Sequence, residues 1–367
     1  MQFKAEGTTI NIMFNQWFSS IGNIMNDIRY RLKEEQDINT KIVATSKRPD
    51  HVYKVNADRF IVENWKNDEE YINFISKTFD NEAIDFFFCK KKADLISEYK
   101  DSLEDSSVAM IMYEDEDVVR ATSNKDDIYK KLLESDNEEL QNIVPKYWSN
   151  LKYETAKSLI ENSNNDLCLK LTNDEGGFSF RQIVNGKSGI ASLNEYWVNK
   201  LRKEEAIELV EQLDREGNLD KIMIMETLDS PEISIDCYEG KQGFIGVSRL
   251  KDGRVQQIFK NEELNELCKQ IKEEFGLKYI FNVQFRLDRN RDKSKPATIK
   301  DLRLIDLNTR ASGGMYEEVA IGINLMYYEL CDAMNKTYST NKYEELGDYN
   351  SEASKEVTHI ERAVVLK

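Results

Sequence analysis

The hydrophobic pattern of this 367-residue chain changes near the middle, and this change constrains the fold more than any other feature. In the first part, short apolar runs alternate with stretches of helical period, which predicts a small parallel sheet with helical crossover connections. From about Leu167 onward, apolar and polar residues alternate with a period of two, which predicts an antiparallel sheet. Glycine divides in the same way, because Gly7 and Gly22 precede a long glycine-free stretch and the other 14 of the 16 glycines lie between Gly176 and Gly347.

These periods locate the individual elements. In the first part we expect strands at 10–14, 41–44, 59–62, 84–88 and 108–112, and helices at 21–35, 69–79, 126–134 and 153–162. In the second part we expect strands at 167–171, 178–183, 222–226, 233–238, 244–250, 255–259, 279–287 and 302–308, and helices at 203–216, 262–275 and 317–334. The polar segment 337–356 is expected to be loose, and 360–366 is a candidate edge strand.

Charge narrows the choice of partners. Lys and Arg total 51 against 67 Asp and Glu, which gives a net charge of −16 that repels nucleic acid and anionic membrane surfaces. No apolar run approaches the roughly 20 residues of a membrane-spanning helix. Two histidines and five dispersed cysteines disfavour a zinc site, a disulfide framework and Ser-His-Asp chemistry. We therefore expect a cytoplasmic protein whose anionic ligands are held by local cations, backbone N–H groups or a divalent metal.

The sharpest motif is Leu302–Met315, which reads LRLIDLNTRASGGM. Asp306 and Asn308 are two apart on a predicted strand, so they project from one face, and their oxygens suit a hard cation such as Mg²⁺. If the strand that carries Gln284 is an antiparallel neighbour, Gln284 is a third ligand. Arg310 would then reach a phosphate bound by that metal. The ordinary alternative is that Asp and Asn at a strand end form a turn.

Two further segments suit a nucleotide. Lys170 lies in an apolar strand that runs into a glycine loop with Gly176, Gly177, Phe178 and Ser179, where backbone N–H groups and the lysine can hold a triphosphate. A plain hairpin with a surface-reaching lysine is the alternative. The strand ending at Glu226, Thr227 and Leu228 offers main-chain groups to an adenine edge, and Glu232 can accept from ribose hydroxyls. Either glutamate is otherwise a solvated turn residue.

The order of these residues resembles the ATP-grasp superfamily. The resemblance covers about 125–334 and rests on Lys125 at a helix start, Pro145, Lys170 before the Gly-Gly loop, Glu226 with Glu232, Gln284, and Asp306-x-Asn308-x-Arg310 before Ser312-Gly313-Gly314. Within the superfamily the chain resembles carbamoyl-phosphate-synthase-like proteins, and among these the biosynthetic family associated with tellurite-resistance operons. It departs from their pattern at Asp306, where they usually have Glu, and at Leu171 and Thr309, where they usually have Pro.

The resemblance implies a mixed α/β and α+β chain with an ATP-grasp fold behind a small parallel preATP-grasp domain. The implied domains are 1–120 (preATP-grasp), 121–335 (ATP-grasp, with the lid in 121–220 and the metal-bearing central sheet in 221–335) and 336–367 (a C-terminal extension). It implies that Lys125 and Lys170 bind ATP phosphates under a loop at 175–179, and that 226–228 form the adenine hinge with Glu232 on the ribose. Gln284, Asp306 and Asn308 would bind Mg²⁺, or Mn²⁺ in its place, and Arg310 would steady the transferred phosphoryl group.

The implied activity is an ADP-forming ligase that activates a carboxylate as an acyl phosphate for attack by an amine or a similar nucleophile. Two alternatives stay open: a non-catalytic nucleotide-binding module, and an enzyme that phosphorylates bicarbonate or carbamate. The expected partners are small-molecule carboxylate and amine substrates, and a homodimer is the expected assembly if the chain is not a monomer.

Overall fold

The computed structural model describes residues 9–164, 166–173, 177–186, 199–253 and 255–358. By its internal contacts the chain divides into two compact units. The first unit comprises Met1–Thr122, Glu232–Gln284 and Asp306–Lys367, and the second comprises Ser123–Pro231 and Phe285–Ile305. Among the described residues, none of the helices combines the length and apolar composition needed to cross a membrane.

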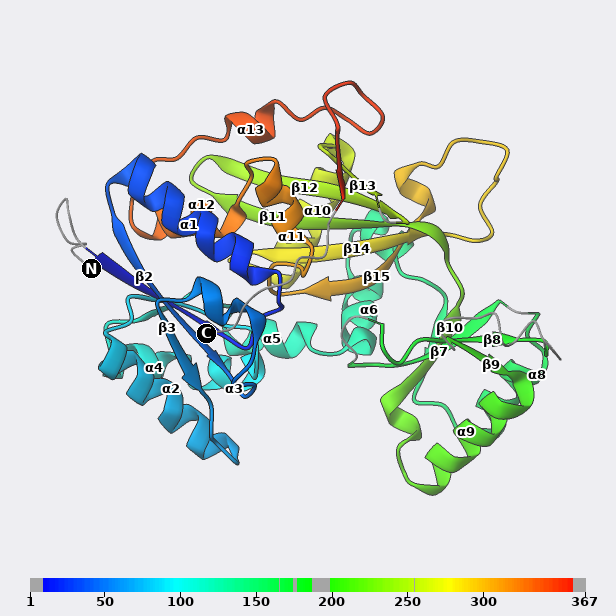
Figure 1. Ribbon diagram of the computed structural model, residues 1–367. Coiled ribbons are helices and arrows are strands. Elements are labelled where there is room, and N and C mark those ends of the chain that lie inside the picture. Colours follow the sequence, from blue (N-terminus) through cyan, green and yellow to red (C-terminus); the bar gives the residue numbers. More distant parts are fainter. Residues whose placement is uncertain (1–8, 165, 174–176, 187–198, 254, 359–367) are drawn as a thin grey trace. The chain divides into compact units, whose positions relative to one another are not determined.

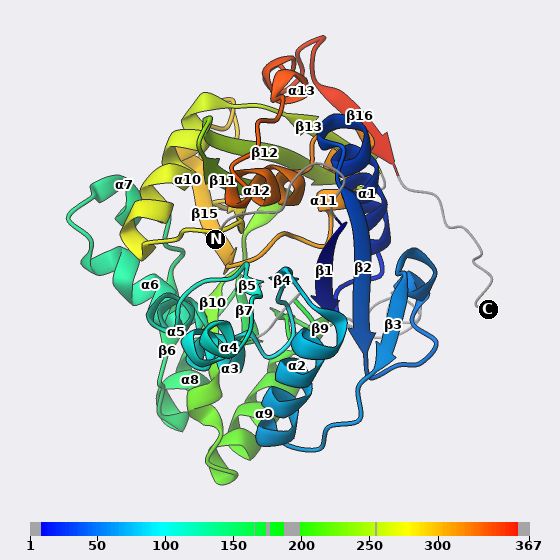
Figure 2. The same ribbon diagram turned by 90° about the vertical axis from the view of Figure 1, so that its left-hand side faces the viewer.

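The first unit begins with the predicted parallel sheet, whose strand order is β3-β2-β1-β4-β5 (Figure 2). Its strands are β1 (Thr9–Asn15), β2 (Asn39–Ser46), β3 (Arg59–Val62), β4 (Phe86–Phe88) and β5 (Met110–Ile111). Its helices are α1 (Ile21–Gln36), η1 (Val52–Asn56), α2 (Asp68–Glu82), α3 (Ala93–Glu98), α4 (Lys100–Ser106) and α5 (Glu116–Thr122). Alternate residues of β1 enter different cores, since Ile12 and Phe14 pack with α1 while Met13 packs with α2.

A six-stranded sheet follows, with the strand order β15-β14-β11-β12-β13-β16 (Figure 1). Its strands are β11 (Asp229–Gly240), β12 (Gly243–Asp252), β13 (Val255–Phe259), β14 (Phe281–Leu287), β15 (Leu302–Asn308) and β16 (Lys355–Thr358). The accompanying helices are α10 (Glu262–Phe275), η4 (Ile299–Asp301), α11 (Met315–Ala320), α12 (Leu325–Ala333) and α13 (Asn341–Glu344). Most of this sheet belongs to the first unit, where Ile245 and Val247 of β12 share one core with Ile24 of α1 and Leu330 of α12.

The second unit contains a five-stranded sheet with the order β6-β10-β7-β8-β9. Its strands are β6 (Tyr147–Ser149), β7 (Leu167–Leu171), β8 (Arg181–Val184), β9 (Lys200–Arg202) and β10 (Ile222–Glu226). Its helices are α6 (Lys125–Glu134), α7 (Glu138–Asn142), α8 (Tyr153–Glu161), α9 (Lys203–Arg215) and η3 (Leu219–Lys221). Helices α8 and α9 pack on this sheet through Ile160 and Val210, which share a core with Leu169 and Ile224.

Three expectations about the second part of the chain were wrong. The single antiparallel sheet is two separate sheets, and one pair of strands, β8 with β9, is parallel. The single helix at 317–334 is two helices, because Gly322 adopts a φ of 90° and Asn324 then caps α12 by accepting from the Tyr327 N–H group. The segment 337–356 is not wholly loose, since it contains α13 and the start of β16, which pairs with β13. The candidate edge strand at 360–366 lies outside the described residues.

Candidate functional site

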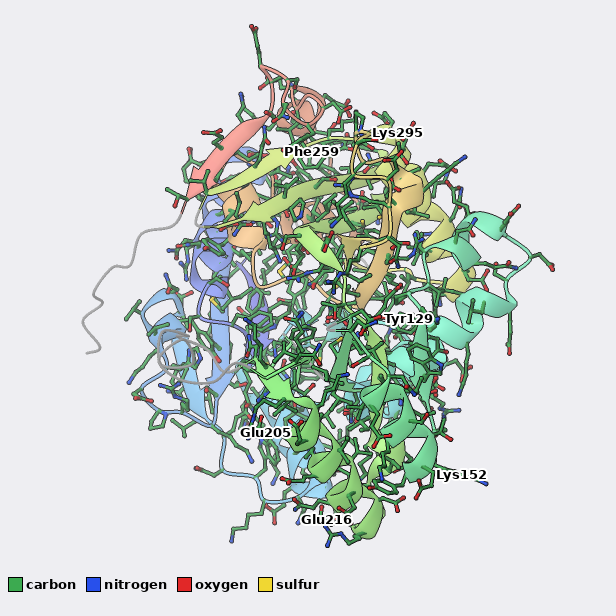
Figure 3. All side chains as sticks on the ribbon, turned by 90° about the vertical axis from the view of Figure 1, so that its right-hand side faces the viewer. Tyr129, Lys152, Glu205, Glu216, Phe259 and Lys295 are labelled. Carbon is green, nitrogen blue, oxygen red and sulfur yellow. The ribbon has the colours of Figure 1, made fainter. Side chains whose placement is uncertain are left out.

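The two lysines predicted to bind phosphate lie in the second unit, next to the same strand end. Lys170 is on β7, is only 8% exposed, and its Nζ lies 3.5 Å from the hydroxyl of Tyr129. Tyr129, which lies on α6, is labelled in Figure 3. Tyr129 in turn donates to the Leu304 carbonyl at 3.0 Å. Lys125 opens α6, and its N–H group donates to the carbonyl of Thr172, two residues after Lys170, at 2.8 Å. The structure therefore places Lys170 on β7 and the backbone of Lys125 beside the residue that follows this strand.

The glycine loop connects β7 to β8 in an antiparallel hairpin. The Ser179 hydroxyl accepts from the Leu171 N–H group at 2.9 Å, which closes the base of the loop. Gly177 has a φ of 70°, a conformation that favours glycine, and Phe178 is 84% exposed. Gly176 lies outside the described residues. The described part of the loop thus presents a large apolar side chain to solvent directly after a strand that carries a buried cation.

The segment predicted as an adenine hinge ends β10. The Glu226 N–H group donates to the Lys146 carbonyl at 2.9 Å, and the Lys146 N–H group donates to Glu226 Oε1 at 3.0 Å. The Thr227 N–H group donates to the Asp166 carbonyl at 2.6 Å. Two of the three main-chain N–H groups of this segment, those of Glu226 and Thr227, are therefore engaged within the second unit.

A recess of about 480 Å³ adjoins this hinge within the second unit. It is lined by Glu226 and Tyr147 together with the ion pair of Arg303 and Asp288, whose atoms are 2.6 Å apart. Burial and the nearby Asp126 carboxylate raise the pKa of Tyr147 to about 12. The Glu226 carboxylate thus takes part both in a main-chain contact and in the wall of a polar recess.

The three predicted metal ligands belong to the first unit and lie on the adjacent strands β14 and β15. Asp306 and Asn308 are half-buried on either side of buried Leu307, so they share one face of β15. Gln284 is half-buried on β14 between buried Val283 and Phe285. In β15 the alternation shifts by one residue, because Ile305 and Asp306 are both half-buried. Asp306 and Asn308 therefore both lie on the half-buried end of β15, next to the strand that carries Gln284.

The donor set of these three residues suits Mg²⁺. The Gln284 amide nitrogen donates to Asn282 Oδ1 at 2.9 Å, and the Asn308 amide nitrogen donates to Asp306 Oδ2 at 3.0 Å. Each amide group therefore donates one hydrogen bond to a neighbour through its nitrogen, which leaves its oxygen as the atom that could bind a cation. One carboxylate and two amide oxygens, completed by substrate phosphate oxygens, are a common environment for Mg²⁺. Among the described residues there is no group of three or more His, Cys, Asp or Glu side chains that could hold a metal ion.

Arg310 and Glu232 complete the predicted set in the first unit. The Arg310 guanidinium carbon lies 4.9 Å from the centre of the Phe18 ring, and its Nη1 donates to the Ala311 carbonyl at 3.2 Å. Glu232 on β11 forms an ion pair of 2.7 Å with Lys251, the residue directly opposite it on the neighbouring strand β12. Thr309 shares a 2.6 Å hydrogen bond with the Tyr113 hydroxyl. The family that the sequence resembles usually has proline at this position.

The sequence analysis did not predict the buried charged network around Arg249 on β12. Its side chain is fully buried and contacts Asp236 at 2.8 Å, Glu318 at 2.9 Å and Glu317 at 3.5 Å. It also donates to the hydroxyl of Ser312, whose N–H group donates to Asp236 at 2.7 Å. The signal was available in principle, because Arg249 interrupts an apolar strand just as Lys170 does.

This network fixes the turn that follows β15. A Cβ atom at Gly314 would lie 1.9 Å from the Arg249 Nη1 atom, so a larger residue there would displace the buried guanidinium. Burial and the neighbouring Asp236 carboxylate raise the pKa of Glu318 well above its usual value, although the guanidinium opposes this shift. Three carboxylates surround one cation here, and their mutual repulsion adds to the burial that raises the pKa of Glu318.

Comparisons with known proteins agree with this architecture. Residues 218–352 match the family described as ATP-grasp in the biosynthetic pathway with Ter operon, and no curated protein matches the sequence. N5-carboxyaminoimidazole synthetase from Staphylococcus aureus complexed with ADP is 14% identical, with a TM-score of 0.61 over 92% of this chain and 80% of that chain. The biotin carboxylase domain of Hydrogenobacter thermophilus 2-oxoglutarate carboxylase is 14% identical, with a TM-score of 0.60 over 91% and 72%.

A third similar structure is L-amino acid ligase from Bacillus licheniformis, at 14% identity and a TM-score of 0.57 over 91% of this chain and 76% of that chain. Each likeness spans nearly the whole chain at low identity, so it establishes the fold. Together with the match of 218–352, these likenesses show that the chain has the ATP-grasp fold.

Proposed function

We propose that this protein is an ATP- and Mg²⁺-dependent, ADP-forming ligase that joins a carboxylate to an amine. The observation that carries the proposal is the sequence Asp306-x-Asn308-x-Arg310 at the end of β15, next to the strand that carries Gln284. The similar structures support it, since one is a complex with ADP, one contains MgADP and bicarbonate, and one is an amino acid ligase.

The proposed chemistry addresses a weakness of carboxylates. A carboxylate is a poor electrophile because it already bears negative charge and has no good leaving group, and phosphorylation by ATP removes both obstacles. The protein then has mainly to align phosphates and to neutralise charge. Lys125 and Lys170 would bind the ATP phosphates under the loop that includes Phe178 and Ser179, while Arg310 would steady the transferred phosphoryl group.

The remaining residues would hold the base, the ribose and the metal. Leu228 would donate to the adenine edge, beside Glu226 and Thr227, and Glu232 would accept from ribose hydroxyls. Gln284, Asp306 and Asn308 would hold Mg²⁺, which neutralises phosphate charge when it is bound. The substrates we expect are small molecules, and we expect the enzyme to act in the cytoplasm, as a monomer or a homodimer.

Bicarbonate is the second candidate for the group that is phosphorylated. The Hydrogenobacter structure with MgADP and bicarbonate favours it, since that protein shares this fold. The two candidates differ in one measurable property, because a bicarbonate-phosphorylating enzyme releases ADP when bicarbonate is added without any other carboxylate.

Thermal unfolding with and without ATP and Mg²⁺ tests the nucleotide site. A ligand that binds only the folded state at 100 times its Kd stabilises it by about 2.7 kcal/mol. We expect ATP with Mg²⁺ to raise the midpoint of the wild-type protein clearly, and Asp306→Ala to lose much of this shift. Asp292→Ala, which alters an exposed aspartate in the link between β14 and β15, is the matched control and should keep it.

Activity provides the second test. Lys170→Ala and Asp306→Ala should abolish ADP release, because the first removes a cation that would neutralise phosphate charge and the second removes a carboxylate that would hold Mg²⁺. Near-normal turnover in both variants, or no stabilisation of the wild-type protein by ATP with Mg²⁺, would refute the proposal. Nucleotide binding without ADP release from any pool of carboxylates, amines or bicarbonate would instead identify a non-catalytic binding module.

A further inference from the structure

Gln284 can bind a cation through only one end of its side chain. A glutamine amide carries an oxygen, which suits Mg²⁺, and an NH₂ group, which does not, and the two ends exchange places when the group turns by half a rotation. Gln284 therefore serves as a ligand only in the orientation that leaves its oxygen to the metal. The side chain that contacts its amide nitrogen is Asn282, which lies two residues earlier on the same face of β14.

The orientation of Asn282 is itself fixed by the neighbouring strand β11. Asn282 is fully buried, and its amide nitrogen lies 3.0 Å from the main-chain carbonyl oxygen of Ile235. A main-chain carbonyl only accepts hydrogen bonds, so the group that faces it must be the Asn282 NH₂ group. The Asn282 oxygen consequently faces the other way, where it lies 2.9 Å from the Gln284 amide nitrogen. A reversed Gln284 amide would place its oxygen against that of Asn282.

A buried cation anchors this arrangement. The Asn282 amide nitrogen also donates to the Ser234 hydroxyl oxygen at 3.1 Å, and the same oxygen accepts from Arg249 Nη2 at 3.2 Å. Arg249 only donates hydrogen bonds, and its ion pair of 2.8 Å with Asp236 holds it in place. The hydrogen bonds that lead from Arg249 through Ser234 and Asn282 to Gln284 therefore all have a defined direction. All of these residues belong to the first unit.

We infer that Asn282 is a positioning residue for the proposed metal site, which turns the Gln284 amide so that its oxygen is available to Mg²⁺. This inference rests on the proposed function. Without Asn282, the Gln284 amide would populate both orientations, and binding of the cation would have to select one and to order the side chain. A carboxylate in place of the Gln284 amide would need no such partner, because both of its ends are oxygens.

The test measures Mn²⁺ binding to the full chain in the presence of ADP. Free Mn²⁺ is followed by its electron paramagnetic resonance signal, and the Mn²⁺ held by ADP without protein is subtracted. Asn282→Leu removes the amide with little change in volume. Asn265→Leu is the matched control, since Asn265 is another buried asparagine of the first unit and donates to the Tyr343 hydroxyl at 2.7 Å. Asn282→Leu is also combined with Gln284→Glu.

We expect Asn282→Leu to weaken Mn²⁺ binding by about 10- to 100-fold, the usual effect of removing a residue that orients a metal ligand, while Asn265→Leu leaves it unchanged. In the Gln284→Glu protein, the same replacement of Asn282 should cause no such loss, because the carboxylate has no unsuitable end. Asn282→Ser, whose hydroxyl oxygen ends at the position of the Asn282 Cγ atom, replaces the leucine variant if that variant does not fold.

A loss of equal size with Gln284 and with Gln284→Glu would indicate a general structural effect and would overturn the inference. Equal Mn²⁺ binding by Asn282→Leu and Asn265→Leu would also overturn it. If the wild-type protein binds Mn²⁺ with ADP in these cases, the proposed function stands. If the wild-type protein binds no Mn²⁺ beyond that held by ADP alone, the proposed function fails, and this inference fails with it.

Discussion

At the scale of single residues, the contacts of Arg249 bear directly on the stability of the first unit. It lies fully buried among Asp236, Glu317 and Glu318, with three ion pairs of 2.8 to 3.5 Å. We predict that Arg249→Met lowers the free energy of unfolding by about 3–5 kcal/mol, because it leaves buried carboxylates without their cation. Urea denaturation followed by tryptophan fluorescence measures this loss.

Lys251→Met is the matched control, because Lys251 is two residues further along the same strand and forms an ion pair of 2.7 Å that is partly exposed. Such pairs contribute about 0–1 kcal/mol. A loss in Arg249→Met no larger than that in Lys251→Met would show that the buried network does not stabilise the fold.

The sequence is enough to predict the relative position of two side chains when both lie on the same strand. A period of two is enough to place Asp306 and Asn308 on one face, and the structure bears this out. The Arg249 network could not be deduced in this way, because its partners come from segments 13 to 69 residues away in sequence. The same holds for the contact of Lys90 and Arg310 with Phe18, which joins three distant segments.

At the scale of elements, the two glycines in the turn from β15 to α11 should differ in how much stability is lost when each is replaced by alanine. We predict that Gly314→Ala lowers the free energy of unfolding by about 1–3 kcal/mol, because the new methyl group would overlap the buried Arg249 guanidinium. Gly313→Ala should cost less, because its methyl group would make an ordinary contact of 3.5 Å with Phe18. Chemical denaturation of the two variants makes the comparison, and equal losses would contradict the assigned role of Arg249.

Elements with a strong local pattern were predicted well. The bounds of β3, β7, β10, β13, β15 and α10 are those expected from the sequence. The failures occur where a few residues override the pattern. The predicted strand at 178–183 begins only at Arg181, because Gly177 and the residues after it form a turn, and Gly322 divides the predicted helix at 317–334. The split into two sheets depends on pairing between distant strands, which no local period encodes.

At the scale of the whole molecule, buried carboxylates make stability depend on pH. Burial raises the pKa of Glu329 well above the usual 4.5, and the nearby Glu114 and Asp332 add to this shift. Burial likewise raises the pKa of Glu114. Above pH 4.5 the unfolded chain loses these protons while the folded protein keeps them, so the free energy of unfolding falls as the pH rises toward the folded-state pKa.

We predict that Glu329→Gln becomes progressively more stable than the wild-type protein as the pH rises from 5 to 8, by up to about 1.4 kcal/mol per pH unit. Glutamine keeps a side-chain oxygen that can accept the 3.1 Å hydrogen bond from the Ile280 N–H group. Unfolding midpoints over this pH range provide the test, and a stability difference that does not vary with pH would contradict it.

Glu205→Gln is the control of opposite sign. The hydrogen bond with Arg202 lowers the pKa of Glu205, so its contribution is present above its usual pKa of 4.5 and is lost as the pH falls through the lowered folded-state value. The variant should therefore be slightly less stable than the wild-type protein at neutral pH, and this difference should disappear in acid.

The pairing of β16 with β13 also has a consequence for self-association. Without β16, the apolar strand β13, which contains Val255, Ile258 and Phe259, would present its open backbone groups at the rim of the six-stranded sheet. Exposed strand rims of this kind recruit other chains and promote aggregation. The strand β16 is only four residues long, is mostly exposed and includes Lys355 and Glu356, so it terminates the sheet with charged side chains that discourage the addition of a further strand. We therefore expect this short charged strand to disfavour the addition of a strand from a second molecule.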